Sequence, residues 1–137
     1  MMYFLDSNVC IEYMREGKAA KAIKSKFVQH GLKEGKIMIP AIVVAELMHG
    51  AYKSKRPDET LEETLSFLED FSIVSFGEDE ADMYGQIRAN LERRGLLIGN
   101  NDMLIAATAL TYNATLITNN TNEFSRIDGL KLEDWTI

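Results

Sequence analysis

Three carboxylates interrupt apolar segments of this chain. Asp6 follows the apolar run "YFL", Glu46 lies inside "IVVAELM", and Asp102 directly precedes "MLIAATAL". Each acid, taken alone, has a structural explanation. Asp6 is explained as a cap of the following helix, Asp102 as a complement to the helix dipole, worth about 0.3–1 kcal/mol, and Glu46 by solvent exposure. A metal site would instead require the acids to meet in space, so the elements that position them decide between these interpretations.

Five short apolar segments are predicted to be β-strands. They lie at residues 3–5, 36–40, 72–76, 114–118 and 130–135. Helical segments separate them, and parallel strands require such long crossover connections. The order of elements predicts an α/β fold, a single-domain α/β/α sandwich over residues 1–137 with a mostly parallel central sheet.

Six helices are predicted from apolar periodicity and from residues typical of helix ends. They cover residues 7–14, 18–34, 41–54, 57–71, 78–94 and 98–113. Ser7 or Asn8 is expected to cap the first helix. The second helix is expected to bury Phe27 and Val28, among others, and the fourth is expected to bury Leu65. The third and fourth helices are expected to be antiparallel neighbours.

Composition and charge are those of an ordinary globular protein, with 46% hydrophobic and 26% charged residues. Cys10 is the only cysteine, so an intramolecular disulfide is excluded and a reducing cytoplasm is expected. Neither a signal peptide nor a membrane span is predicted. The net charge of −6 disfavours a broad basic surface, although basic residues cluster around 18–26, 53–56 and 88–94. Each cluster is explained by a solvated helix face.

Polar residues follow the fourth predicted strand, where "LITNNTNEF" places Thr118, Asn119 and Asn120 directly after an apolar run. Ligands of parallel α/β sheets bind outside the carboxyl ends of the strands, so this turn is expected to share one edge with Asp6 and Asp102. Anions gathered at one edge repel each other unless a cation lies among them. Because the ligands are oxygens, that cation is expected to be Mg²⁺ or Mn²⁺.

Four stretches of the chain, taken in order, carry a resemblance to a known family. "FLDSNVCIEY", "IPAIVVAELMHG", "IGNNDMLIAATAL" and "ATLITNNTNEFSRIDGLKLEDW" are similar to the PIN-domain ribonucleases, specifically the VapC toxins of bacterial toxin–antitoxin pairs. The similarity covers most of the chain at consistent spacing. Each motif alone is common, so the resemblance rests on the ordered set.

The resemblance implies an acidic centre that binds Mg²⁺, for which Mn²⁺ can substitute. Its members would be Asp6, Glu46 and Asp102. Many PIN domains have an acid at the place of Asn120, and Glu123, one helical turn further on, is the nearest acid able to serve as the fourth member. The implied supporting polar residues are Ser7, Asn8, Thr118, Asn119 and Asn120.

The resemblance also implies an activity and partners. The activity would be metal-dependent hydrolysis of phosphodiester bonds by activated water, in a structured RNA such as tRNA. The implied partners are a VapB-type antitoxin and a second copy of the chain, as a homodimer. An acidic cleft is complementary to a cation, which supports an antitoxin that places a basic side chain near the acids.

Single features of the sequence also fit three other functions. A phosphatase with Asp6 as nucleophile is disfavoured, because Asn8 stands where a second acid is usual. A di-iron or zinc site built on Glu46-x-x-His49 is disfavoured, because such sites need that pair twice and the chain has it once. A Mg²⁺-binding regulatory or binding domain without nuclease activity stays open, and growth arrest on expression would separate it from a toxin.

Overall fold

The computed structural model describes residues 1–137 and contains one five-stranded sheet. Its strands are β1 (Tyr3–Leu5), β2 (Ile37–Pro40), β3 (Ser72–Val74), β4 (Thr115–Ile117) and β5 (Lys131–Glu133). They lie in the order β3-β2-β1-β4-β5, and every neighbouring pair is parallel. The predicted α/β sandwich is confirmed, and its sheet is parallel throughout.

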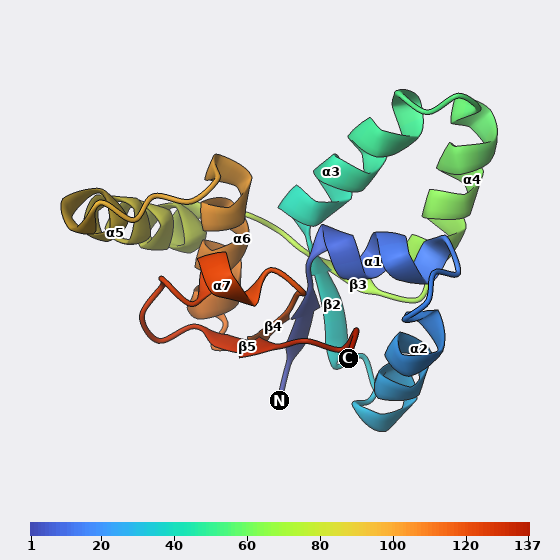
Figure 1. The fold of residues 1–137 in the computed structure, drawn as a ribbon, viewed down its shortest axis with the longest axis horizontal. Coiled ribbons are helices and arrows are strands. Elements are labelled where there is room, and N and C mark those ends of the chain that lie inside the picture. The colour runs from blue at the N-terminus through green and yellow to red at the C-terminus, as the bar shows by residue number, and fades with distance from the viewer.

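Seven helices flank the sheet. They are α1 (Ser7–Met14), α2 (Ala20–Gln29), α3 (Ala41–Tyr52), α4 (Pro57–Leu68), α5 (Glu78–Arg94), α6 (Asn100–Thr111) and α7 (Thr121–Phe124). Six of them were predicted, whereas α7 is too short to show an apolar period. Figure 1 shows α3 and α4 side by side as the predicted antiparallel pair, with α5 extending to the other side of the molecule.

The central strand, β1, determines where the acidic edge lies. Its residues Phe4 and Leu5 are fully buried, as an all-parallel sheet with helices against it requires. Leu5 pairs in register with Ile117 of β4. Asp6 and Thr118, the residues that follow this pair, therefore leave the sheet side by side.

Within the predicted 18–34 segment, the sequence places the end of the helix around Gly31 or Gly35, and α2 ends shortly before the first of these, at Gln29. Gly31 and Gly35 have φ angles of +89° and +71°, left-handed conformations that suit glycine and follow the end of the helix. The predicted burial of Val28 is wrong, since its side chain is 75% exposed. One residue along a helix rotates a side chain by about 100°, which takes Val28 off the buried face that carries Phe27.

The predicted burial of Leu65 on α4 is also wrong, because it is 48% exposed. The buried residues are Thr64 and Phe67. The Thr64 hydroxyl donates to the carbonyl oxygen of Thr60 at 2.8 Å, which satisfies the buried polar group. Phe67 packs against Phe71 with ring centroids 4.9 Å apart. Tertiary packing therefore shifted the buried face of α4 by one residue from the leucine pattern.

Two residues without an assigned chemical role are in the core. Cys10 is fully buried, and Trp135 is 1% exposed with its ring 5.4 Å from that of Tyr3. His49 is exposed on the surface of α3. None of the helices combines the length and the apolar character needed to cross a membrane.

Candidate active site at the carboxyl edge of the sheet

Asp6 follows β1 directly and is 3% exposed. Its Oδ1 accepts a hydrogen bond from the backbone N–H of Ser7 at 2.8 Å, so Asp6 is the N-cap of α1. Of the caps that the sequence offers for this helix, Asp6 is confirmed and Ser7 or Asn8 is wrong, because the extended backbone needed at a cap already occurs at Asp6. Oδ2 accepts from the Thr118 hydroxyl at 2.8 Å and from the Asn8 amide at 3.0 Å. Both oxygens of this buried carboxylate are thus held by donors.

The polar turn after β4 holds this arrangement together. The Nδ2 of Asn8 lies 3.2 Å from Oγ1 of Thr118, and its Oδ1 accepts from the backbone N–H of Asn119 at 3.3 Å. The backbone N–H of Asn120 donates to the same Oγ1 at 3.0 Å. Residues 110 positions apart in the sequence therefore form one network, because β1 and β4 are neighbours in the sheet.

The four candidate acids lie close enough to change one another's ionisation. Burial raises the pKa of Asp6, and its hydrogen bonds offset part of this rise. Burial, followed by the charge of Asp6, raises the pKa of Glu46. The pKa of Asp102 is raised to about 6, by burial first and then by the charges of Asp6, Glu123 and Glu46. The charge of Asp6 thus acts on Glu46, and the charges of Asp6, Glu123 and Glu46 act on Asp102.

Glu46 has one carboxylate oxygen without a partner. Its Oε1 is buried and receives no hydrogen bond, which is unfavourable for a carboxylate unless a cation or water contacts it. Polar side chains of Asn101 and Ser7 beside the carboxylate offset part of the rise in its pKa. Sequence reasoning missed Asn101 as a site residue. Its position next to Asp102, at the start of the same helix, was the available signal.

Glu123 reaches the cluster from the short helix α7. Its Oε2 accepts a hydrogen bond from the Asn120 side-chain amide at 3.3 Å. Asn120 therefore contacts the acid cluster through Glu123. Asn122 is exposed, and its carbonyl oxygen accepts from the Ser125 hydroxyl at 2.7 Å.

The oxygen atoms at this edge of the sheet suit a divalent cation as ligands. Carboxylate, hydroxyl and amide oxygens are the ligands that Mg²⁺ and similar ions prefer. A cation would reduce the repulsion among the four acids and would give the buried Oε1 of Glu46 a partner. As the side chains stand, no three His, Cys, Asp or Glu residues form a ready ligand set.

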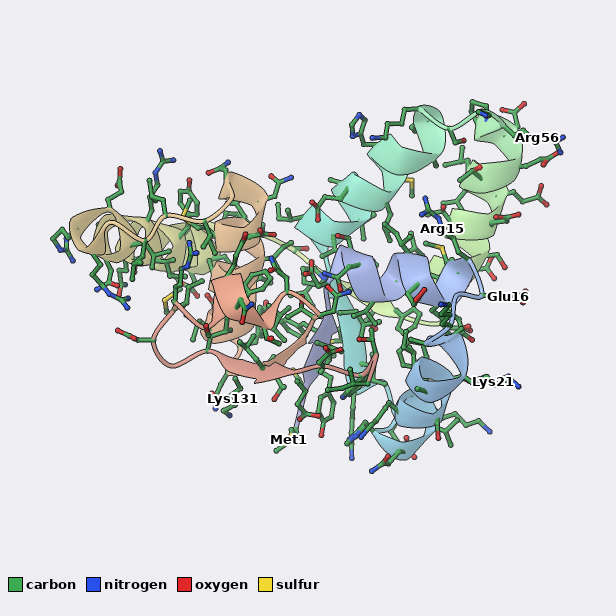
Figure 2. All side chains as sticks on the ribbon, in the orientation of Figure 1. Met1, Arg15, Glu16, Lys21, Arg56 and Lys131 are labelled. Atoms are coloured by element: carbon green, nitrogen blue, oxygen red, sulfur yellow. The ribbon has the colours of Figure 1, made fainter.

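A cleft of about 740 Å³ opens beside the acids, between α1, α3 and α4. Ser7, Glu46 and Asn101 line it, which connects the cleft to the acid cluster. Arg15 and Lys53 also line it, and Figure 2 shows Arg15 at the end of α1 that faces α4. Its apolar lining includes Ile11, Met14, Ile42, Leu47 and Ala51. The cleft therefore combines apolar, cationic and acidic side chains.

Thr118→Val is expected to lower the free energy of unfolding by about 1–3 kcal/mol, because it removes a buried hydroxyl that serves Asp6, Asn8 and the N–H of Asn120. Urea unfolding measures the change. The matched control is Thr108→Val, since the Thr108 hydroxyl bonds only the Leu104 carbonyl of its own helix, at 2.9 Å. That control is expected to change stability by less than about 1 kcal/mol. Equal effects in the two variants would show that the network around Asp6 adds nothing.

The fold and the site together define a class: parallel α/β domains that gather carboxylates at the carboxyl ends of their strands to bind divalent metal. This chain belongs to the PIN domain family, whose profile matches residues 3–130. Nucleases of that family generally depend on divalent metal ions. The resemblance to VapC toxins is confirmed by individual relatives.

The relatives are similar over their whole length. Ribonuclease VapC2 of Rickettsia felis is 39% identical over 135 residues, which is 98% of each chain. The tRNA(fMet)-specific endonuclease VapC of Shigella flexneri is 34% identical over 136 residues, 99% of each chain. The crystal structure of R. felis VapBC2 bound to a DNA fragment from its promoter matches with a TM-score of 0.90 at 38% identity, over 98% of this chain and 99% of that one.

Proposed function

We propose that this chain is a metal-dependent endoribonuclease that acts in the cytoplasm as the toxin of a toxin–antitoxin pair. The observation that carries the proposal is the cluster of four acids at one edge of the sheet, with Asp6 fixed by donors from two elements. The full-length similarity to a ribonuclease and to a tRNA endonuclease supports the same chemistry.

The proposed cation is Mg²⁺, for which Mn²⁺ can substitute. When bound, it would lower the pKa of a water molecule and neutralise charge on the phosphate oxygens. Asp6 and Asp102 are the proposed principal ligands. Glu46, through its free Oε1, is the proposed ligand or water-orienting base. Thr118 and Asn8 hold Oδ2 of Asp6, and the Ser7 N–H holds Oδ1, before the ion arrives.

Glu123 is the proposed fourth member of the shell, through a water molecule, in preference to Asn120. Two observations support this choice. The charge of Glu123 raises the pKa of Asp102, after burial and Asp6, and the Asn120 amide donates to Glu123. A crystal grown with Mn²⁺ in which Glu123 points away from the ion would reject it.

A structured RNA such as tRNA is the proposed substrate, because the S. flexneri relative is named for tRNA(fMet). Recognition would rest on phosphate contacts and exposed loops, as is general for such RNA.

The proposed protein partners are a VapB-type antitoxin and a second copy of the chain. The R. felis structure is a VapBC2 complex. The cleft between α1, α3 and α4 supports an antitoxin segment there, since its apolar lining suits apolar side chains and the adjacent acids suit a basic one. A basic partner that copurifies and inhibits cleavage would support this proposal, and one that binds without inhibiting would count against it.

The test of the function combines cells and purified protein. Expression without an antitoxin is expected to arrest growth, and the RNA ends that arise after brief induction would identify the RNA and the cut position. Purified protein is expected to cleave RNA with Mg²⁺ or Mn²⁺ and to stop when EDTA is added. Equal cleavage in EDTA would reject the metal mechanism, and a tolerated protein without cleavage would favour a regulatory domain.

A further inference from the structure

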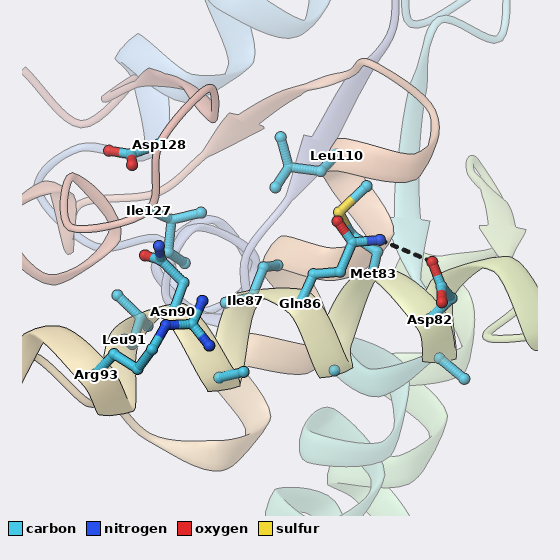
Figure 3. A pocket seen from close by; sticks show the side chains of 13 residues that line it. Asp82, Met83, Gln86, Ile87, Asn90, Leu91, Arg93, Leu110, Ile127 and Asp128 are labelled. Atoms are coloured by element: carbon cyan, nitrogen blue, oxygen red, sulfur yellow. Dashed lines mark hydrogen bonds between the residues drawn. The ribbon is translucent and has the colours of Figure 1, made fainter.

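The two sides of α5 face opposite ends of α6, because the helices cross (Figure 1). On one side, the Tyr84 hydroxyl donates to Oδ1 of Asn100, the first residue of α6. On the other side lies a shallow hollow of about 830 Å³, bordered by Leu110 near the last turn of α6 (Figure 3). Asp102 belongs to the first turn of α6. The Tyr84 side of α5 is therefore the side nearer the acid cluster.

Arg88 is held on that side of α5. Its Nη1 donates to the Tyr84 hydroxyl at 2.9 Å, one helical turn back. Its Nε lies 3.9 Å from Oε1 of Glu92, a surface contact that contributes little. Nη2 is left for another acceptor, and the side chain is 47% exposed. Arg88 is thus an oriented and accessible cation.

The other two arginines of the α5 cluster are placed elsewhere. Nη1 of Arg94 donates to the carbonyl oxygen of Arg126 at 2.9 Å, which fastens α5 to the segment after α7. Arg93 lines the hollow with Asp128, as Figure 3 shows. Five residues along a helix correspond to a rotation of about 140°, so Arg93 and Arg88 point away from each other. Of the three arginines, only Arg88 lies on the side of α5 that contacts the first turn of α6, which carries Asp102.

We propose that Arg88, oriented by Tyr84 and Asn100, binds a phosphate of the RNA strand beside the one that is cut. This inference rests on the proposed nuclease function and assigns it a substrate-binding residue outside the acid cluster. Four acids repel a polyanion, and a fixed cation on the neighbouring helix offsets that repulsion. A guanidinium also matches phosphate geometrically, with paired N–H donors that lysine lacks.

Tyr84 is the positioning residue in this arrangement. Its ring packs against the core, while its hydroxyl contacts both Arg88 and Asn100. Tyr84→Phe therefore keeps the packing and releases the guanidinium. A purely structural role for Tyr84 would change stability and leave the KM for RNA unaltered.

The experiment measures binding and cleavage of labelled bulk tRNA by the full-length chain. Binding is followed by fluorescence anisotropy over a range of NaCl concentrations, in an Asp6→Asn background that prevents cleavage. Arg88→Ala is expected to weaken binding roughly tenfold and to reduce the salt slope by about 0.7–1, the signature of one lost phosphate contact. In the active protein it is expected to raise KM and to leave kcat largely unchanged. Arg88→Lys and Tyr84→Phe are expected to give smaller losses in the same direction.

Two matched controls are available. Arg93→Ala removes an arginine from the same helix, and Arg56→Ala removes one at the far end of α4 (Figure 2). Both are expected to bind tRNA like the parent. Unchanged binding by Arg88→Ala, or an equal loss in Arg93→Ala, would overturn the assignment while cleavage by the wild type persists. Failure of the wild type to cleave any RNA would instead reject the nuclease function. Should Arg88→Ala lose its circular dichroism signal, Arg88→Lys and Tyr84→Phe decide.

Discussion

Asp6→Asn is expected to reduce metal-dependent RNA cleavage by about 10³-fold or more, because an amide cannot supply the negative charge that holds the cation. The same substitution is expected to keep or raise the stability of the metal-free protein. Burial raises the pKa of Asp6, which means that the fold disfavours its charged form. Asparagine is also a good N-cap: its one amide oxygen can still accept from the Ser7 N–H, and its NH2 group can donate to the Thr118 hydroxyl in place of the bond that Asp6 accepts. Cleavage activity should therefore fall, while the stability of the metal-free protein is kept or raised.

Three measurements check this prediction: the cleavage rate with Mn²⁺, Mn²⁺ affinity by calorimetry, and urea unfolding in EDTA. Asp70→Asn is the control, because Asp70 is an exposed aspartate outside the acid cluster. It is expected to alter stability by less than about 0.5 kcal/mol and to leave cleavage unchanged. Full activity in Asp6→Asn would exclude Asp6 as a metal ligand, and an unfolded variant would show that its role is structural.

The metal-free protein is expected to be more stable at about pH 5 than at about pH 7.5, the reverse of usual acid destabilisation. The pKa of Asp102 is raised from an ordinary 3.8 to about 6 in the fold. Between these values the folded protein binds more protons than the unfolded chain, so stability is lost as the pH rises through this window. The pKa values of Asp6 and Glu46 are shifted in the same direction. For the half-exposed Asp102 the effect is on the order of 1 kcal/mol.

Thermal unfolding in EDTA at several pH values measures this dependence, with Asp102→Asn as the comparison. In the variant, the stability is expected to depend less on pH, because the contribution of Asp102 is removed. Added Mn²⁺ is expected to stabilise the wild type most above about pH 6, where protons no longer compete for the carboxylates, and its affinity should fall below that pH. Identical pH profiles for the wild type and Asp102→Asn would contradict the raised pKa.

Much of the fold was predictable because local sequence carries the relevant signals. Runs of neighbouring residues predict the apolar strands, a proline predicts the start of α3, and a glycine predicts the end of α5. That glycine, Gly95, has the left-handed φ of +67° that suits a residue just after a helix. Two of the errors concern which face of a helix is buried. Val28 and Leu65 fit an apolar pattern, yet both are exposed. Burial depends on what lies opposite a helix, which the helix's own sequence does not specify.

The sequence by itself determined the positions of three acids within their elements. Asp6 follows an apolar strand, Asp102 stands at a helix start, and Glu46 lies inside an apolar helix. Only the tertiary structure decided which atoms meet. It placed Thr118 and Asn8 on Oδ2 of Asp6, left Oε1 of Glu46 free, and separated three clustered arginines into different surroundings. The physical reason is that periods and caps are local, whereas these contacts join distant residues and follow from strand order and register.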